Sequence, residues 1–119
     1  MLLVKYSKTG GQVKFIVTLD GTDWWRYSYT GDREYLNDGK LQKPKTHSLG
    51  MPADFEKEIH NWEFTLGNVQ NIPIKVKMNI VWEQDGNQLN KWINGGNEEI
   101  EIGANAAETI GESIFLVGV

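Results

Sequence analysis

The side chains that could act as catalytic bases or metal ligands are few. His47 and His60 are the only two histidines, whereas a catalytic zinc site needs about three protein ligands. No HExxH spacing accompanies them, so we expect both to be polar residues at the surface or at a sheet edge. The sequence has no cysteine, which excludes thiolate nucleophiles, cysteine zinc sites and disulfides. GxSxG and the phosphate-loop motif are also absent, so no known nucleophile motif supports catalysis.

Two pairs of carboxylates recur at a spacing of two residues, Glu56 with Glu58 and Glu99 with Glu101. Glycosidases use two carboxylates that flank the scissile bond, and a strand would place each pair on one face. Ile100 alternates with the second pair, however, which is typical of a half-buried strand whose charged face is solvated. We therefore predict a protein that is not an enzyme and that needs no cofactor.

Aspartates beside glycine-bearing turns are the remaining candidates for metal binding. Asp20, Asp23 and Asp32 flank the aromatic segment 24–29 and could offer oxygens to calcium, which takes about six to eight of them. Their spacing does not match an EF-hand loop, and Asp-Gly is above all a turn pair. We therefore predict no metal site. A calcium-dependent membrane-binding sandwich is the third functional hypothesis, and an enzyme is the fourth.

Tryptophan is the residue type that exceeds its usual frequency most clearly. Five tryptophans in 119 residues are roughly three times the ordinary share. Residues 24–29 read WWRYSY, and the two-residue period of a strand puts Trp24 and Arg26 on one face and Trp25 on the other, with both tyrosines. Either the face of Trp25 is the core and Trp24 lies outside, or the assignment is reversed and three rings form an exposed stripe.

These rings are the best candidates for contact with a ligand, because aromatic side chains bury much area while losing few torsions. We predict that Trp24, Arg26 and Trp92 form the ligand-binding set. Arg26 offers a planar fork to carboxylate or hydroxyl groups beside the ring of Trp24. Trp92 belongs to another strand and is expected on the mixed face of its hairpin, away from the main apolar face.

Strands must position these residues. Thirteen glycines separate short apolar alternations, which is the pattern of an all-β protein. We predict one domain, residues 1–119, with about eight antiparallel strands in a β-sandwich of jelly-roll or immunoglobulin-like topology. A small closed barrel is the alternative. At most one short helix is expected, near residues 53–61, and that segment could equally lead into a strand.

The clearest element is a hairpin around residues 85–86, an Asp-Gly pair that suits a two-residue type I′ turn. Such a turn pairs Gln84 with Asn87 and would place Trp82 opposite Leu89. The predicted core face of its first strand comprises Ile74, Val76, Met78, Ile80 and Trp82. The last strand, at 114–117, has no polar alternation, so it should be central in its sheet or paired with another chain.

The charge distribution limits the possible partners. The net charge is −4, with an excess of basic residues in 1–50 and of acidic residues in 51–119. A general nucleic-acid binder normally has a basic footprint, so we predict no nucleic-acid partner. No apolar run has the roughly 18 residues of a membrane span or the roughly 7–15 of a signal peptide. The chain is therefore expected to be soluble, and either cytoplasmic or secreted with its signal removed.

The functional prediction that follows is a non-catalytic binding module that presents surface aromatics to a glycan or a protein ligand. The alternative is a homo-oligomeric structural subunit that uses the same aromatic face and its terminal strands for contact with further copies. The uneven charge would suit such a head-to-tail contact.

Overall fold

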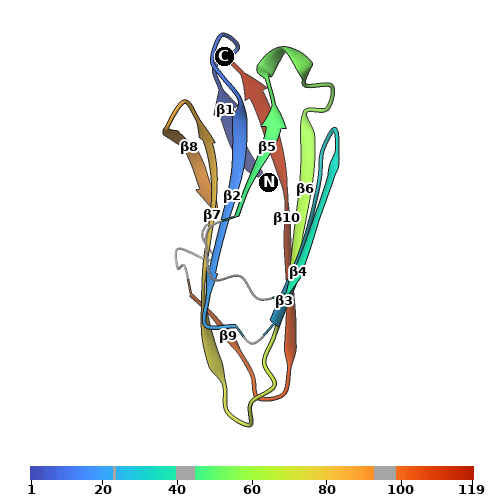
Figure 1. The fold of residues 1–119 in the computed structure, drawn as a ribbon, viewed down its shortest axis with the longest axis vertical. Coiled ribbons are helices and arrows are strands. Elements are labelled where there is room, and N and C mark those ends of the chain that lie inside the picture. The colour runs from blue at the N-terminus through green and yellow to red at the C-terminus, as the bar shows by residue number, and fades with distance from the viewer. Residues whose placement is uncertain (23, 40–44, 93–98) are drawn as a thin grey trace.

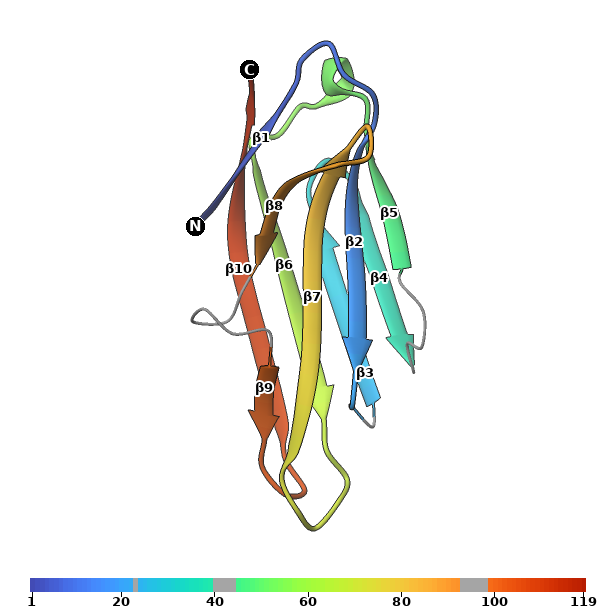
Figure 2. The same ribbon diagram turned by 90° about the vertical axis from the view of Figure 1, so that its left-hand side faces the viewer.

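The computed structural model describes residues 1–22, 24–39, 45–92 and 99–119, with the backbone alone for 36–39. Two β-sheets pack face to face along a molecule of 50 × 26 × 23 Å (Figure 1 and Figure 2). The strands are β1 (Leu2–Tyr6), β2 (Val13–Asp20), β3 (Trp24–Thr30), β4 (Glu34–Gly39), β5 (Lys45–Gly50), β6 (Ile59–Gly67), β7 (Ile74–Gln84), β8 (Asn87–Trp92), β9 (Glu99–Ile102) and β10 (Ala107–Gly118).

The strand order confirms the predicted β-sandwich and excludes the closed barrel. One sheet has the order β1-β10-β6-β3-β4, and the other has the order β5-β2-β7-β8, with β9 also pairing with β7. All pairs are antiparallel except β1 with β10, which is parallel, so the prediction of antiparallel strands throughout is wrong at this pair. The described residues form ten strands rather than about eight.

The segment near 53–61 contains no α-helix. It forms a single 3₁₀ turn, η1 (Pro52–Asp54), and then enters β6 at Ile59. Glu56 and Lys57 instead donate their backbone N–H groups to the carboxylate of Asp32, at 3.1 and 2.8 Å. The described part of the chain also contains no helix of the length and hydrophobicity that spanning a bilayer requires.

The core lies between the two sheets and is rich in aromatic rings. On β7 the predicted face is confirmed: four of its five residues are buried, and Ile74, at the end of the strand, is half-buried. The final strand is also central, because β10 lies between β1 and β6. The buried apolar residues contributed by β2, β3 and β6 are Val13, Phe15, Val17, Leu19, Trp25, Tyr27, Tyr29, Trp62, Phe64 and Leu66.

The hairpin between β7 and β8 begins as predicted and then changes register. Asp85 and Gly86 have positive φ angles of 52° and 79°, as a type I′ turn requires, and Gln84 pairs with Asn87. The register then shifts between Trp82 and Glu83. Beyond this bulge, the pairing predicted from the turn is wrong by one residue. Each following side chain of β8 therefore lies on the face opposite to the predicted one.

Candidate functional site

The outer face of the first sheet presents two of the three predicted ligand-binding residues. Trp25 is buried in the core, whereas Trp24 is 39% exposed and Arg26 is exposed on the opposite side of β3. Of the two arrangements that the sequence allowed, the structure therefore has the one with Trp24 outside. The neighbouring strands β6 and β10 extend this outer face on one side of β3.

The ring of Trp24 is held against the sheet by a glycine. Trp24 pairs with Gly67 on β6, and a Cβ atom added to Gly67 would overlap the indole nitrogen of Trp24. The indole therefore occupies the space that a side chain at residue 67 would fill. Thr22 links the ends of β3 and β6 at this point, since its hydroxyl donates to the carbonyl oxygens of Trp24 and Gly67, at 2.9 and 3.2 Å. One side of the ring is thus covered by backbone, and the ring remains partly open to solvent.

A row of polar side chains lies next to Trp24 along the strands. Arg26 pairs with Thr65 on β6, and Thr65 pairs with Thr109 on β10. The two threonine hydroxyls are hydrogen-bonded to each other at 3.2 Å. Arg26 forms no ion pair with any side chain that the structure describes.

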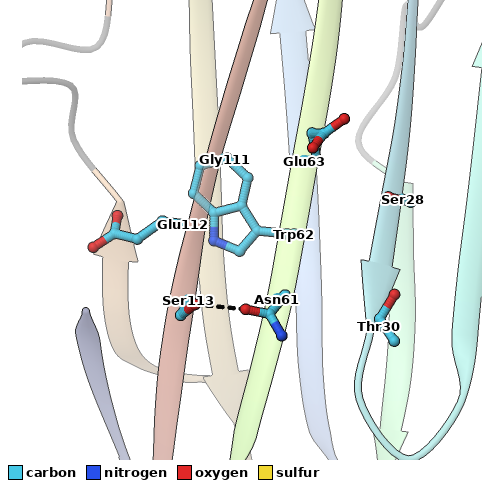
Figure 3. A pocket seen from close by; sticks show the side chains of 8 residues that line it. All are labelled: Ser28, Thr30, Asn61, Trp62, Glu63, Gly111, Glu112 and Ser113. Carbon is cyan, nitrogen blue, oxygen red and sulfur yellow. Dashed lines mark hydrogen bonds between the residues drawn. The ribbon is translucent and has the colours of Figure 1, made fainter.

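Beyond this row, a shallow groove of about 520 Å³ crosses β3, β6 and β10 (Figure 3). Its floor is lowered at Gly111, which pairs with Glu63 and has no side chain to fill the face. At one end Ser113 donates to the side-chain oxygen of Asn61 at 2.5 Å. The lining residues are Ser28, Thr30, Asn61, Trp62, Glu63, Gly111, Glu112 and Ser113.

Trp92 does not share this surface. It is 8% exposed, and its ring packs edge-on against Trp62 with 5.1 Å between the ring centroids. The register shift in the β7–β8 hairpin pairs Trp92 with Ile80, a core residue, instead of leaving it on the mixed face. The structure therefore separates Trp92 from Trp24 and Arg26, and we do not retain it as a ligand-binding residue.

Both histidines bind tyrosine hydroxyls, which the sequence did not indicate. His60 is 1% exposed, and its Nδ1 lies 2.7 Å from the hydroxyl of Tyr29, so the prediction of a surface or edge position is wrong for His60. His47 is half-buried on β5, an edge strand, with Nε2 2.5 Å from the hydroxyl of Tyr27. The edge position predicted for His47 is confirmed.

Burial also sets the protonation of these groups. Desolvation lowers the pKa of His60, although Asp32 and the backbone of Lys57 act in the opposite direction. Desolvation and the charge of Lys45 lower the pKa of His47. Both imidazoles are therefore favoured in their neutral forms. His60 acts as a hydrogen-bonding group of the core, and His47 does so at the edge of its sheet.

The three aspartates considered for calcium are not gathered into one site among the described residues. Asp20 ends β2 and is exposed, whereas Asp32 follows β3 and accepts the N–H groups of Glu56 and Lys57. The full length of β3 separates them, which is roughly 20 Å for a strand of this size. Asp23 lies outside the described residues. Within the described residues, no three His, Asp or Glu side chains lie close enough together to hold a metal ion.

Comparison of the chain with protein-family models, with curated proteins and with solved structures found no match. The chemistry of the site therefore has to be argued from its own residues. The outer face combines an indole ring, a guanidinium group, a carboxylate and several hydroxyls over three neighbouring strands. Such a surface can stack on an apolar ligand face while exchanging hydrogen bonds with polar groups along its edge.

Proposed function

We propose that this protein is a non-catalytic binding module whose ligand is a glycan that lies across the outer face of β3, β6 and β10. One observation supports this most directly: the partly exposed ring of Trp24, fixed over Gly67, stands at one end of a polar face that leads to the groove. A sugar ring has an apolar face and a rim of hydroxyls. An indole beside polar side chains complements both parts of it.

The polarity of the groove favours a glycan over a protein ligand. The buried centre of a protein interface is depleted in charged residues and rich in aromatic ones. The groove instead presents two carboxylates, those of Glu63 and Glu112, and a set of small hydroxyl and amide side chains from three strands. Glycan hydroxyls both donate and accept hydrogen bonds. They therefore suit the Glu63 carboxylate as an acceptor and the Arg26 guanidinium as a donor.

A glycan array probed with the full chain, followed by calorimetry on the glycans it retains, tests this proposal. The variant Trp24→Ala should lose most of the binding, because the stacking surface is removed, whereas Trp24→Phe should retain part of it. Arg26→Ala should also weaken binding, and Lys14→Ala is its matched control, since Lys14 lies on the outer side of the other sheet. The melting temperature of each variant shows whether it is folded.

Two outcomes would count against the glycan proposal. If Trp24→Ala retains full affinity for the selected glycans, the ring does not contact them. If Lys14→Ala weakens binding as much as Arg26→Ala does, the ligand lies on the other sheet. If Trp24→Ala loses binding and also has a much lower melting temperature, the Trp24→Phe variant decides between the two causes. A folded Trp24→Phe variant with weakened binding would show that the indole contacts the ligand.

The second candidate function is self-association, and a different part of the same face favours it. Leu3 on β1 and Ile59 on β6 are exposed, and both pair with Phe115 of β10. Together they form an apolar row across three strands. Under this hypothesis the molar mass in solution should exceed that of one chain at micromolar concentration and should fall in Ile59→Ser. A monomer over a tenfold concentration range would exclude it.

A further inference from the structure

The loop between β6 and β7 forms one end of the molecule and exposes two large apolar side chains. Val69 is 67% exposed and Ile72 is 62% exposed. In Figure 1 and Figure 2 this loop, drawn in yellow-green, is the lowest part of the ribbon, and both chain termini lie away from it. We call residues 68–73 the distal tip. Its two β-branched side chains project from a convex end rather than from a flat sheet face.

The distal tip and its surroundings carry no charge over two separate segments. Residues 67–74 contain no Asp, Glu, Lys or Arg, and neither do residues 102–107, which form the adjacent turn. Lys75 is the first charged residue after the distal tip. Moving a charged side chain into a lipid environment is costly. This end of the molecule can therefore approach hydrocarbon without burying a charge.

Hydrogen bonds within the protein hold the distal tip in one conformation. Asn68 is buried, and its side chain donates to the carbonyl oxygens of Ile72, Ile102 and Gly103 at 2.8, 3.2 and 2.9 Å. Its side-chain oxygen accepts the N–H of Gln70 at 2.9 Å. These bonds satisfy backbone groups that would otherwise need water as a partner. An unsatisfied backbone group is costly in a lipid environment, so this arrangement lowers the cost of moving the distal tip into one.

The adjacent turn, residues 102–107, is hydrogen-bonded to the distal tip. The backbone N–H of Asn105 donates to the carbonyl of Gln70 at 2.9 Å, and its side chain donates to the side-chain oxygen of Asn71, also at 2.9 Å. Little conformational entropy therefore remains to be lost when the distal tip meets a surface. The exposure of Val69 and Ile72 is a fixed feature of this end.

The ring of Trp24 lies at the base of the distal tip. Trp24 pairs with Gly67, the residue that precedes the loop, and its indole covers that glycine. Indole rings combine an apolar body with an N–H donor and are enriched where membrane and water meet. The partly exposed indole lies over Gly67, the residue that precedes the apolar loop. This is the position that an anchor at the interface of membrane and water would occupy.

We propose that the distal tip docks on the surface of a lipid bilayer, with Val69 and Ile72 inserted at the boundary between headgroups and acyl chains. The chemistry favours zwitterionic lipid. The net charge of the chain is −4, and the nearest lysines, Lys75 and Lys77, stand opposite Glu101 and Glu99 on β9. Among the described residues these pairs leave no net positive charge beside the distal tip, so apolar insertion must supply the affinity. Val69 and Ile72 lie outside the proposed glycan-binding face, whereas Trp24 borders both surfaces.

The absence of cysteine allows a direct test of insertion. Single variants Val69→Cys, Ile72→Cys and Met51→Cys are labelled with an environment-sensitive fluorophore and mixed with phosphatidylcholine vesicles. Met51 is the matched control, because it is 43% exposed but lies directly before η1, at the other end of the molecule from the distal tip (Figure 1). The emission should shift to the blue at residues 69 and 72 and remain unchanged at residue 51. No shift at either tip position would overturn the proposal.

Vesicle co-sedimentation of the unlabelled chain gives a second, independent readout. Burial of one such side chain contributes roughly a tenfold gain in partitioning or more. The double variant Val69→Ser with Ile72→Ser should therefore lose most of its vesicle binding at an unchanged melting temperature, whereas Met51→Ser should bind as the parent does. Adding phosphatidylserine should not improve binding. A strict requirement for anionic lipid, or equal loss in Met51→Ser, would show that a different surface makes the contact.

Discussion

At residue 67 the absence of a side chain decides where the ring of Trp24 lies. The backbone of Gly67 is not in the left-handed region, so its conformation does not require glycine. The requirement comes from the indole, which occupies the position of the missing Cβ atom. A glycine inside a strand is usually unfavourable, and an aromatic ring over it restores the lost contacts.

This contact predicts a coupling between two substitutions. Gly67→Ala should destabilise the protein by about 1–2 kcal/mol, because the new methyl group displaces a ring that is packed against the sheet. In the Trp24→Ala background the same change should cost nearly nothing or be slightly stabilising, since alanine is preferred to glycine in a strand. Urea denaturation of the four proteins measures both effects as a double-mutant cycle. Equal costs in both backgrounds would mean that the ring does not rest on Gly67.

The sequence predicts part of this site and leaves part of it open. Alternation alone separates Trp24 and Arg26 from Trp25, because side chains of a strand alternate between faces. It does not say which face is buried, since both contain aromatic rings. The contact with Gly67 depends on the register between β3 and β6, which are far apart in the chain. Local sequence patterns contain no information about that register.

At the scale of elements, the β7–β8 hairpin shows how one extra residue changes a prediction. The Asp85-Gly86 turn was identifiable because few residue pairs adopt two successive positive φ angles. The bulge that follows has no comparable signature in the sequence, and it reverses the facing of Trp92. Tertiary packing explains the outcome, because Trp92 gains a buried edge-on contact with Trp62.

The end of this hairpin is tied to the N-terminal strand through Gln84. Its buried side chain accepts the N–H of Ser7 at 2.8 Å and donates to the carbonyl oxygens of Ser7 and Gly11, both at 3.0 Å. The carboxylate of Asp85 also accepts the backbone N–H of Gly11, at 3.0 Å. The connection between β1 and β2 therefore depends on a side chain that is more than seventy residues away in the chain.

Removal of the Gln84 side chain should loosen this connection. Gln84→Ala should lower the free energy of unfolding by about 2–3 kcal/mol, because it removes three hydrogen bonds to partly buried backbone groups, of which the carbonyl of Ser7 keeps a second partner in the N–H of Gly10. Gln88→Ala is the control on the neighbouring strand, where the side chain is exposed, and it should change stability by less than about 0.5 kcal/mol. Denaturation curves of the two variants provide the comparison. A similar small effect in both would show that water replaces the Gln84 bonds without loss.

At the scale of the whole molecule, hydrogen bonds between rings connect the two sheets. Tyr27 of the first sheet bonds His47 on β5 of the second. Tyr29 bonds His60 within the first sheet and also lies 3.5 Å from the indole nitrogen of Trp82, on β7 of the second. The sequence predicted the apolar faces of these sheets but not the polar links, because a lone histidine does not reveal which hydroxyl it meets.

These links make the stability of the whole fold dependent on pH. Burial lowers the pKa of His60 and of His47 in the folded state, whereas both should titrate near about 6.5 when unfolded. Below that pH the unfolded chain binds more protons than the folded one, so the free energy of unfolding must fall as the pH falls. The slope for each histidine cannot exceed about 1.4 kcal/mol per pH unit.

Denaturation at a series of pH values from 7 to 5 measures this dependence, and His60→Gln isolates the more deeply buried group. The glutamine amide is neutral at every pH and can still bond the hydroxyl of Tyr29. The parent chain should lose stability steadily over this range, and the variant should lose distinctly less. Parallel curves for the two proteins would mean that His60 accepts a proton without disturbing the core, and the acid sensitivity would then belong to His47 at the sheet edge.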